Sequence, residues 1–311
     1  MLWRRALLAA LTVLAACAAA NGQDARQIVE QAVKTELVAD AADHTHWLYY
    51  EVDSKPNVTV KQWVAETSTG NLTCVVEKNG VTFAKARQRE DMDNFIGNPA
   101  AQANRRKSGE HDDQQATQML SMLPRAFLWT KASTQGNDTI LSFTPNPQFR
   151  PPTWQSRVFA AMAGVMVVNN TQHRIVSLKG HLIRDVKFFF GLLGDLQAGG
   201  SFDVERRELA SGAWQITQTH VHIQGHALIF KTISEQEDDE KSRFEELPAY
   251  ITLAQAENDL LEQSDRPAVR LFRPAPAYAD QRIGSVGPMP AAMAGSRHRL
   301  GAGDPPDHMP D

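Results

Sequence analysis

The feature that most limits the fold is a series of short β-type segments that starts at Trp47. These segments are rich in β-branched and aromatic side chains, and turn signals such as Asn79-Gly80 separate them. Strand-type segments that follow one another at such short intervals are typical of an antiparallel meander. The sequence therefore predicts antiparallel strands over residues 47–52, 58–64, 72–76 and 81–83.

The same pattern returns later in the chain, between segments with a helical period. Further strands are expected at residues 139–143, 164–168, 174–183, 200–209 and 213–233, and the acidic run 235–246 is expected to close the sheet. Apolar residues at helical spacing predict helices over about 24–41, 116–123, 154–162 and 249–263, with Pro124 ending the second. The polar stretch 84–113 indicates a mobile loop. The expected fold class is α+β.

The N-terminus has the pattern of a secretory signal peptide. Arg4 and Arg5 precede an apolar run from Ala6 to Ala16, which is too short to span a bilayer of roughly 30 Å. Leu14-Ala15-Ala16-Cys17 resembles the bacterial lipobox. We therefore expect residues 1–16 to be a signal peptide, Cys17 to carry the lipid and residues 17–23 to be the tether of a lipoprotein anchored to the outer membrane in the periplasm. Cleavage after Ala20, which would release a soluble protein, is the alternative.

Charge and cysteine content exclude some functions. Removal of Arg4 and Arg5 with the signal leaves 30 basic against 36 acidic side chains, so nucleic acid is not an expected partner. If Cys17 is acylated, Cys74 is left alone and no internal disulfide can form. The segment 265–311 holds eight prolines and five glycines among 47 residues, so we expect a disordered tail after a folded domain of residues 24–264.

Three segments, in this order, carry a resemblance to a known family. They are Phe143-Thr144-Pro145-Asn146-Pro147-Gln148-Phe149-Arg150-Pro151, Gly164-Val165-Met166-Val167-Val168 and Gly225-His226-Ala227-Leu228-Ile229-Phe230-Lys231-Thr232. With the lipobox, they look like the lipoprotein-carrier (LolA/LolB-like) superfamily, and more closely like outer-membrane lipoprotein-sorting-like proteins. The resemblance covers about residues 24–247. It implies an antiparallel β half-barrel with helices packed on one face, a hydrophobic ligand and no catalytic residues. The lipobox of this chain favours an anchored acceptor over a soluble shuttle.

The stretch Val186 to Leu196 is the most apolar part of the chain after the signal. If it forms a loop between strands, it exposes enough apolar area to mark a membrane or ligand contact, whereas core packing at a strand end is the alternative. Three adjacent phenylalanines cannot all face one side of a strand. The expected contact residues are Phe188, Phe189, Phe190, Leu192 and Leu193.

Three histidines recur at even positions, and on a strand they would share one face. His220, His222 and His226 form a row that could bind zinc or copper with a suitable partner, although no carboxylate lies at motif spacing. Polar residues on a solvent-facing surface are the simpler interpretation. The signatures of nucleophilic hydrolases, zinc peptidases and phosphate-binding loops are missing, so neither an enzyme nor a cofactor is expected.

These observations lead to two hypotheses about function. The first is a membrane-anchored periplasmic lipoprotein for lipid binding, which holds a lipid, an acyl chain or another hydrophobic ligand in the half-barrel. The second is a periplasmic metal-binding or stress-sensing interaction protein that uses the outer face of the sheet. No motif in the sequence names the ligand or a protein partner for either hypothesis.

Overall fold

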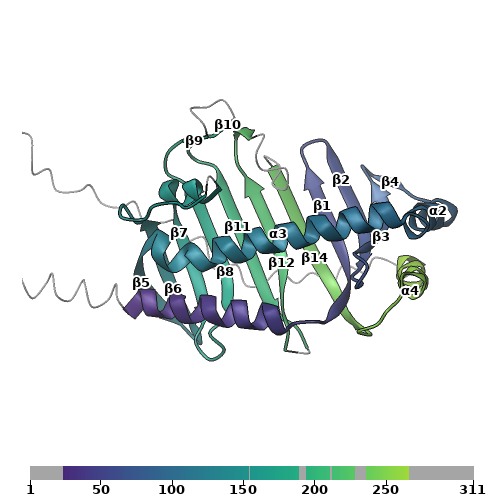
Figure 1. Ribbon diagram of the computed structural model, residues 1–311, viewed down its shortest axis with the longest axis horizontal. Helices are drawn as coiled ribbons and strands as arrows, with labels where there is room; N and C mark the ends of the chain where they lie inside the picture. The colour runs from purple at the N-terminus through teal and green to yellow at the C-terminus, as the bar shows by residue number, and fades with distance from the viewer. Residues whose placement is uncertain (1–23, 154, 189–193, 211, 228–235, 266–311) are drawn as a thin grey trace, which may run out of the picture. The chain divides into compact units, whose positions relative to one another are not determined.

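The computed structural model of the chain describes residues 24–153, 155–188, 194–210, 212–227 and 236–265 (Figure 1). All of them belong to the first of two units into which the chain divides, Met1–Pro267. These residues form an α+β fold around an antiparallel sheet of eleven strands, as the strand pattern predicted. The tail that we expect to be disordered, and the signal peptide, lie outside the described residues.

The large sheet has the strand order β4-β3-β2-β1-β14-β12-β11-β8-β7-β6-β5. Two runs of consecutive strands, β1–β4 and β5–β8, are therefore joined through β14, β12 and β11. The strands are β1 (His46–Lys55), β2 (Val58–Ala65), β3 (Leu72–Lys78), β4 (Val81–Thr82), β5 (Phe127–Gln135), β6 (Asp138–Pro145), β7 (Met162–Asn169), β8 (Ile175–Leu182), β11 (Ser201–Glu208), β12 (Trp214–His222) and β14 (Gln236–Leu247).

Two strand predictions need correction. The acidic strand β14 does not close the sheet at an edge, because it lies between β1 and β12 in the interior. The expected strand 213–233 ends at His222, and Gly225–Ala227 forms β13 in a separate sheet with β10 (Gly194–Leu196) and β9 (Val186–Phe188). Residues 228–235 lie outside the described part.

The first helix covers residues 24–42, close to the predicted 24–41. Its apolar residues recur every three or four positions, so they form one stripe along the helix. Ala25, Val29, Ala32 and Val33 on this stripe are buried against the sheet. The short 3₁₀ helix η1 (Gln155–Ala161) and the helix α4 (Leu253–Asp265) also lie where helices were expected.

The expected loop at 84–113 is wrong, because this segment is helical. It contains α2 (Lys85–Ile96) and most of α3 (Pro99–Ala126), a helix of 28 residues. The Asn98 side chain accepts a hydrogen bond from the Ala101 amide at 3.0 Å, and Pro99 occupies the first turn, as is usual at a helix start. Pro124 does not limit a short helix; it lies in the last turn of α3.

The helices cover both faces of the sheet rather than the one face that we expected. Directly paired residues of antiparallel strands share a face. The face that carries Trp129, Met166 and Leu178, here called the front face, packs against the helix 24–42, the C-terminal part of α3 and η1. The opposite or back face carries Trp63 and Cys74, which pack against α2 and α4.

Candidate functional site

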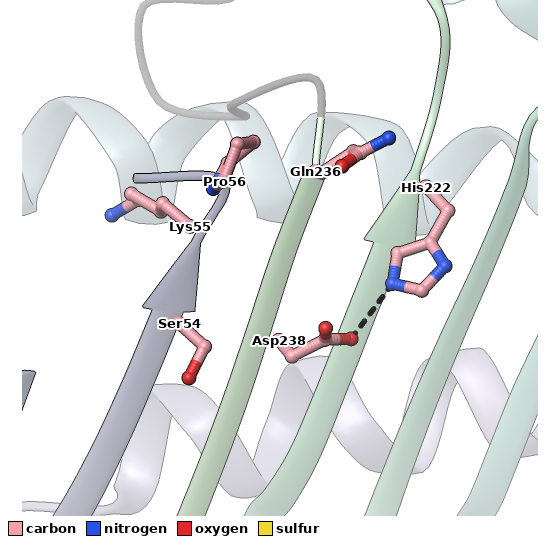
Figure 2. A pocket seen from close by; sticks show the side chains of 6 residues that line it. All are labelled: Ser54, Lys55, Pro56, His222, Gln236 and Asp238. Atoms are coloured by element: carbon pink, nitrogen blue, oxygen red, sulfur yellow. Dashed lines mark hydrogen bonds and ion pairs between the residues drawn. The ribbon is translucent and has the colours of Figure 1, made fainter. Parts of the chain in front are cut away.

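A small pocket lies at the ends of three neighbouring strands. Its volume is about 340 Å³. Ser54 and Lys55 come from the end of β1, His222 from the end of β12, and Asp238 from the start of β14 (Figure 2). Pro56 and Gln236 complete the lining. Five of its six lining residues have polar side chains, and those of His222 and Asp238 lie on the back face of the sheet.

Two histidines in this region share one carboxylate. Asp238 Oδ1 lies 2.7 Å from His220 Nδ1 and 2.9 Å from His222 Nε2. The register explains the contact, because Asp238 is the direct cross-strand partner of His220. Burial alone would raise the pKa of Asp238, but the hydrogen bonds from both imidazoles outweigh it and place that pKa below its usual range.

The arrangement does not support nucleophilic catalysis. Activation of a serine requires a histidine between the hydroxyl and the carboxylate. Here Ser54 is the cross-strand partner of Asp238 itself. Within the described residues, no hydrogen bond joins Ser54 to His222.

The metal-capable row that the sequence suggested is only partly assembled. His220 and His222 do share a face, and Asp238 supplies the carboxylate that sequence spacing did not reveal. His226 belongs to β13, where it pairs with Asp195, and its side chain is not described. Among the described residues, no group of three or more histidine, cysteine or acidic side chains is arranged to hold a metal ion.

The front face of the sheet is apolar on one side and charged on the other. On the β8 and β11 side, the half-buried side chains of Leu178 and Phe202 pack against the same apolar cluster as Met119 and Leu120 of α3. On the β1 and β14 side, Lys241 lies 3.6 Å from a carboxylate oxygen of Glu51. The part of the front face beneath α3 is therefore apolar near β8 and β11 and charged near β1 and β14.

Helix α3 crosses this front face but is fixed mainly at its ends (Figure 1). Near its start, Arg105 donates a hydrogen bond to the Asn71 carbonyl oxygen at 2.8 Å. Near its end, Met122, Leu123 and Ala126 are buried in the core. The six residues 106–111 that follow Arg105 are all exposed. Six residues make more than one and a half turns, so every side of this part of the helix is exposed.

The predicted contact segment is described only at its edges. Phe188 ends β9, and residues 189–193, with Phe189, Phe190, Leu192 and Leu193, connect it to β10. This connection, the side chain of Phe188 and the anchor residue Cys17 lie outside the described part of the structure.

The comparisons with known proteins leave the family open. The chain matches no protein-family model, and no curated protein and no solved structure is significantly similar to it. None of the described helices combines the length and the apolar character needed to cross a bilayer.

Proposed function

We propose that the protein is a membrane-anchored periplasmic lipoprotein that holds a lipid, an acyl chain or another hydrophobic ligand between the front face and α3. The observation that carries the proposal is the exposed middle of α3. A helix that is anchored at both ends and unpacked between them leaves the sheet surface beneath it available to a ligand.

The length of α3 supports a curved sheet. From Arg105 to Ala126 the helix rises by about 32 Å, whereas nine strand spacings from β3 to β5 measure about 43 Å along the sheet. A straight helix can join these two edges only if the sheet curves toward it. This relation favours the half-barrel that the family resemblance implies.

Because the front face is apolar on one side and charged on the other, an amphiphile fits it better than a purely apolar molecule does. Hydrocarbon is stabilised against Leu178 and Phe202, because contact there removes apolar surface from water. A polar or cationic group is stabilised near Glu51 and Asp239 on the other side of the same face. The apolar segment from Phe188 to Leu193 is our proposed contact for the ligand or the membrane.

A fluorescent fatty acid titrated into the purified protein tests the proposal. Met119→Glu places a charge on the half-buried side of α3 and should raise the dissociation constant by about tenfold or more, because a buried unpaired charge is costly. The matched control is Gln118→Glu on the exposed side of the same turn, which should bind like the wild type. A wild-type protein that does not bind the probe, or equal binding by both variants, would refute the proposal.

A second candidate function uses the back face. The pocket beside His222 and Asp238 is open and polar, which favours a metal-binding or sensing role. Isothermal titration with zinc and copper tests this role. A stoichiometric metal whose affinity falls about 100-fold in His222→Ala would favour it over ligand binding under α3. Binding that is unchanged in His222→Ala would exclude this site.

A further inference from the structure

A charged seam lies between the two larger apolar cores of this sheet. One core lies on β5–β8 with the helix 24–42, and the other lies on β1–β3 with α2 and α4. Between them, residues 51–54 of β1 pair with residues 238–241 of β14, and most of these side chains are acidic or basic. At these four residue pairs the strands are joined by backbone hydrogen bonds and ions, whereas next to them Trp47 and Tyr49 of β1 pack against Phe244 of β14.

Two aspartates oppose each other directly in the seam. Asp53 and Asp239 are cross-strand partners on the front face, and like charges in such a pair destabilise the pairing. Each has a buried Oδ1 atom without a hydrogen-bond partner in the described part of the chain. A buried acceptor without a partner is costly, and the cost is larger for an ionised group.

The cations in the seam offset only part of this charge. Lys55 lies 2.9 Å from Asp53 and 3.0 Å from Glu237. Lys241 lies 3.4 Å from Asp239 and 3.6 Å from Glu51. Lys55 and Lys241 thus each lie between two carboxylates, and a proton on Asp239 would reduce the repulsion between Asp53 and Asp239. Val60 of β2 and Thr219 of β12 are the cross-strand neighbours of Asp53 and Asp239, and neither titrates. Two other titratable groups act on the same lysine: the Tyr49 ring lies 5.3 Å from Lys241 Nζ, and the charge of Glu66 raises the pKa of Lys241.

We propose that the seam is a proton-controlled joint, in which protonation between Asp53 and Asp239 tightens the pairing of β1 with β14 and ionisation loosens it. The joint lies in the middle of the sheet, so loosening it frees this part of β1 and β14 locally, while the packing of Trp47 and Tyr49 on Phe244 holds the neighbouring part of the two strands. The proposal concerns the strands themselves and holds whether or not a ligand binds beneath α3.

The electrostatics agree with this role. Burial raises the pKa of Asp239 to about 6; Lys241 lowers it, while Glu51 and Asp53 raise it further. An acid whose folded-state pKa is raised stabilises the closed pair when it is protonated, so that stabilisation is lost as the pH rises through about 6. With this pKa, the equilibrium constant for opening should increase by about tenfold between pH 5 and pH 8.

Hydrogen exchange measured by mass spectrometry on the full chain tests the joint. Peptides from β14 are compared at pH 5 and pH 8 after correction for the intrinsic exchange rates, with peptides from β6 and β7 as an internal reference. The wild type should open β14 about tenfold more often at pH 8, without a matching change in the reference. Because Glu66 also has a raised pKa and acts on Lys241, the comparison is repeated in a Glu66→Gln background, in which Asp239→Asn should reduce the dependence on pH to about twofold or less.

Two further variants make the outcome decisive. Glu240→Gln changes an exposed carboxylate on the back face of the same strand and should keep the full pH dependence. Asp53→Asn removes the opposing charge, so opening at pH 8 should fall toward the value at pH 5. Equal protection of β14 at both pH values in the wild type, or an unchanged pH dependence in Asp239→Asn, would overturn the proposal.

Discussion

The attachment of the first helix to the sheet depends on one buried carboxylate, Glu36. This residue is 4% exposed. It lies 2.9 Å from Arg174 Nη2, accepts the Ile175 amide at 2.7 Å and also pairs with Arg206. The two arginine side chains are only 14% and 19% exposed. Glu36→Ala would therefore leave two mostly buried cations and one buried amide without their partner.

The expected cost follows from this geometry. Removal of one partner from a buried ion pair typically costs about 3–5 kcal/mol, because the remaining charge stays desolvated. For a domain of this size, that loss should lower Tm by about 6–20 °C. Glu36→Gln keeps the shape and one acceptor oxygen, so its free energy of unfolding should lie between those of the wild type and Glu36→Ala.

Urea unfolding followed by circular dichroism measures these differences. The control is Glu30→Ala, which breaks an exposed pair with Arg26 one turn and a half earlier on the same helix. That change should alter the free energy of unfolding by less than about 1 kcal/mol. If Glu36→Ala lowers the free energy of unfolding by less than about 1 kcal/mol, with an unchanged m-value, the contacts of Glu36 with the two arginines do not hold the helix on the sheet.

Four further predictions concern packing, pH and the membrane. Gly164→Ala should destabilise the fold by more than about 3 kcal/mol in thermal unfolding, because a Cβ there would overlap the Lys179 carbonyl oxygen. Burial raises the pKa of Glu66 to about 7, against a hydrogen bond from a backbone amide that lowers it. The free energy of unfolding should therefore fall by about 1.4 kcal/mol between pH 6 and pH 8, and Glu66→Gln should flatten that dependence in urea titrations. Cys17→Ala should abolish lipid labelling and membrane fractionation without unfolding the domain, and unchanged fractionation would contradict the lipobox interpretation. Phe189→Glu should weaken binding of the fatty acid probe with little change in stability, whereas severe unfolding with intact binding would mean that the segment is core.

The strands could be predicted because their pattern is local. Along β3 and β6, buried residues alternate with more exposed ones, as expected for strands with one buried face, while β1, β2 and β7 are recognised by their runs of β-branched and aromatic residues between turn signals. The helix 24–42 was found for the same reason, since its buried stripe repeats every three or four residues.

The helix α3 was missed because its middle is exposed on every side. Without a buried stripe there is no amphipathic period to detect, and the polar composition is also typical of a loop. The signal that was available is the start, where Asn98 precedes Pro99. Pro124 does not shorten the helix, because a proline in the last turn interrupts little of the helix that precedes it.

The polar sites could not be predicted because they depend on non-local pairing. Asp238 meets His220 only because β14 lies beside β12, and no spacing in the sequence encodes that neighbour. The opposition of Asp53 and Asp239 depends in the same way on the pairing of β1 with β14, strands from opposite ends of the domain. An acidic strand in the interior of a sheet also contradicts the usual expectation that such a sequence lies at an edge.

The most direct test of the account is native mass spectrometry of the full-length Cys17→Ala protein, purified from a bacterial periplasm without detergent. Ligand binding beneath α3 predicts a non-covalent lipid that dissociates on collisional activation and whose occupancy falls in the double variant that also carries Met119→Glu. Protein that is free of lipid, and that stays so after incubation with an excess of fatty acid, would contradict the proposed function.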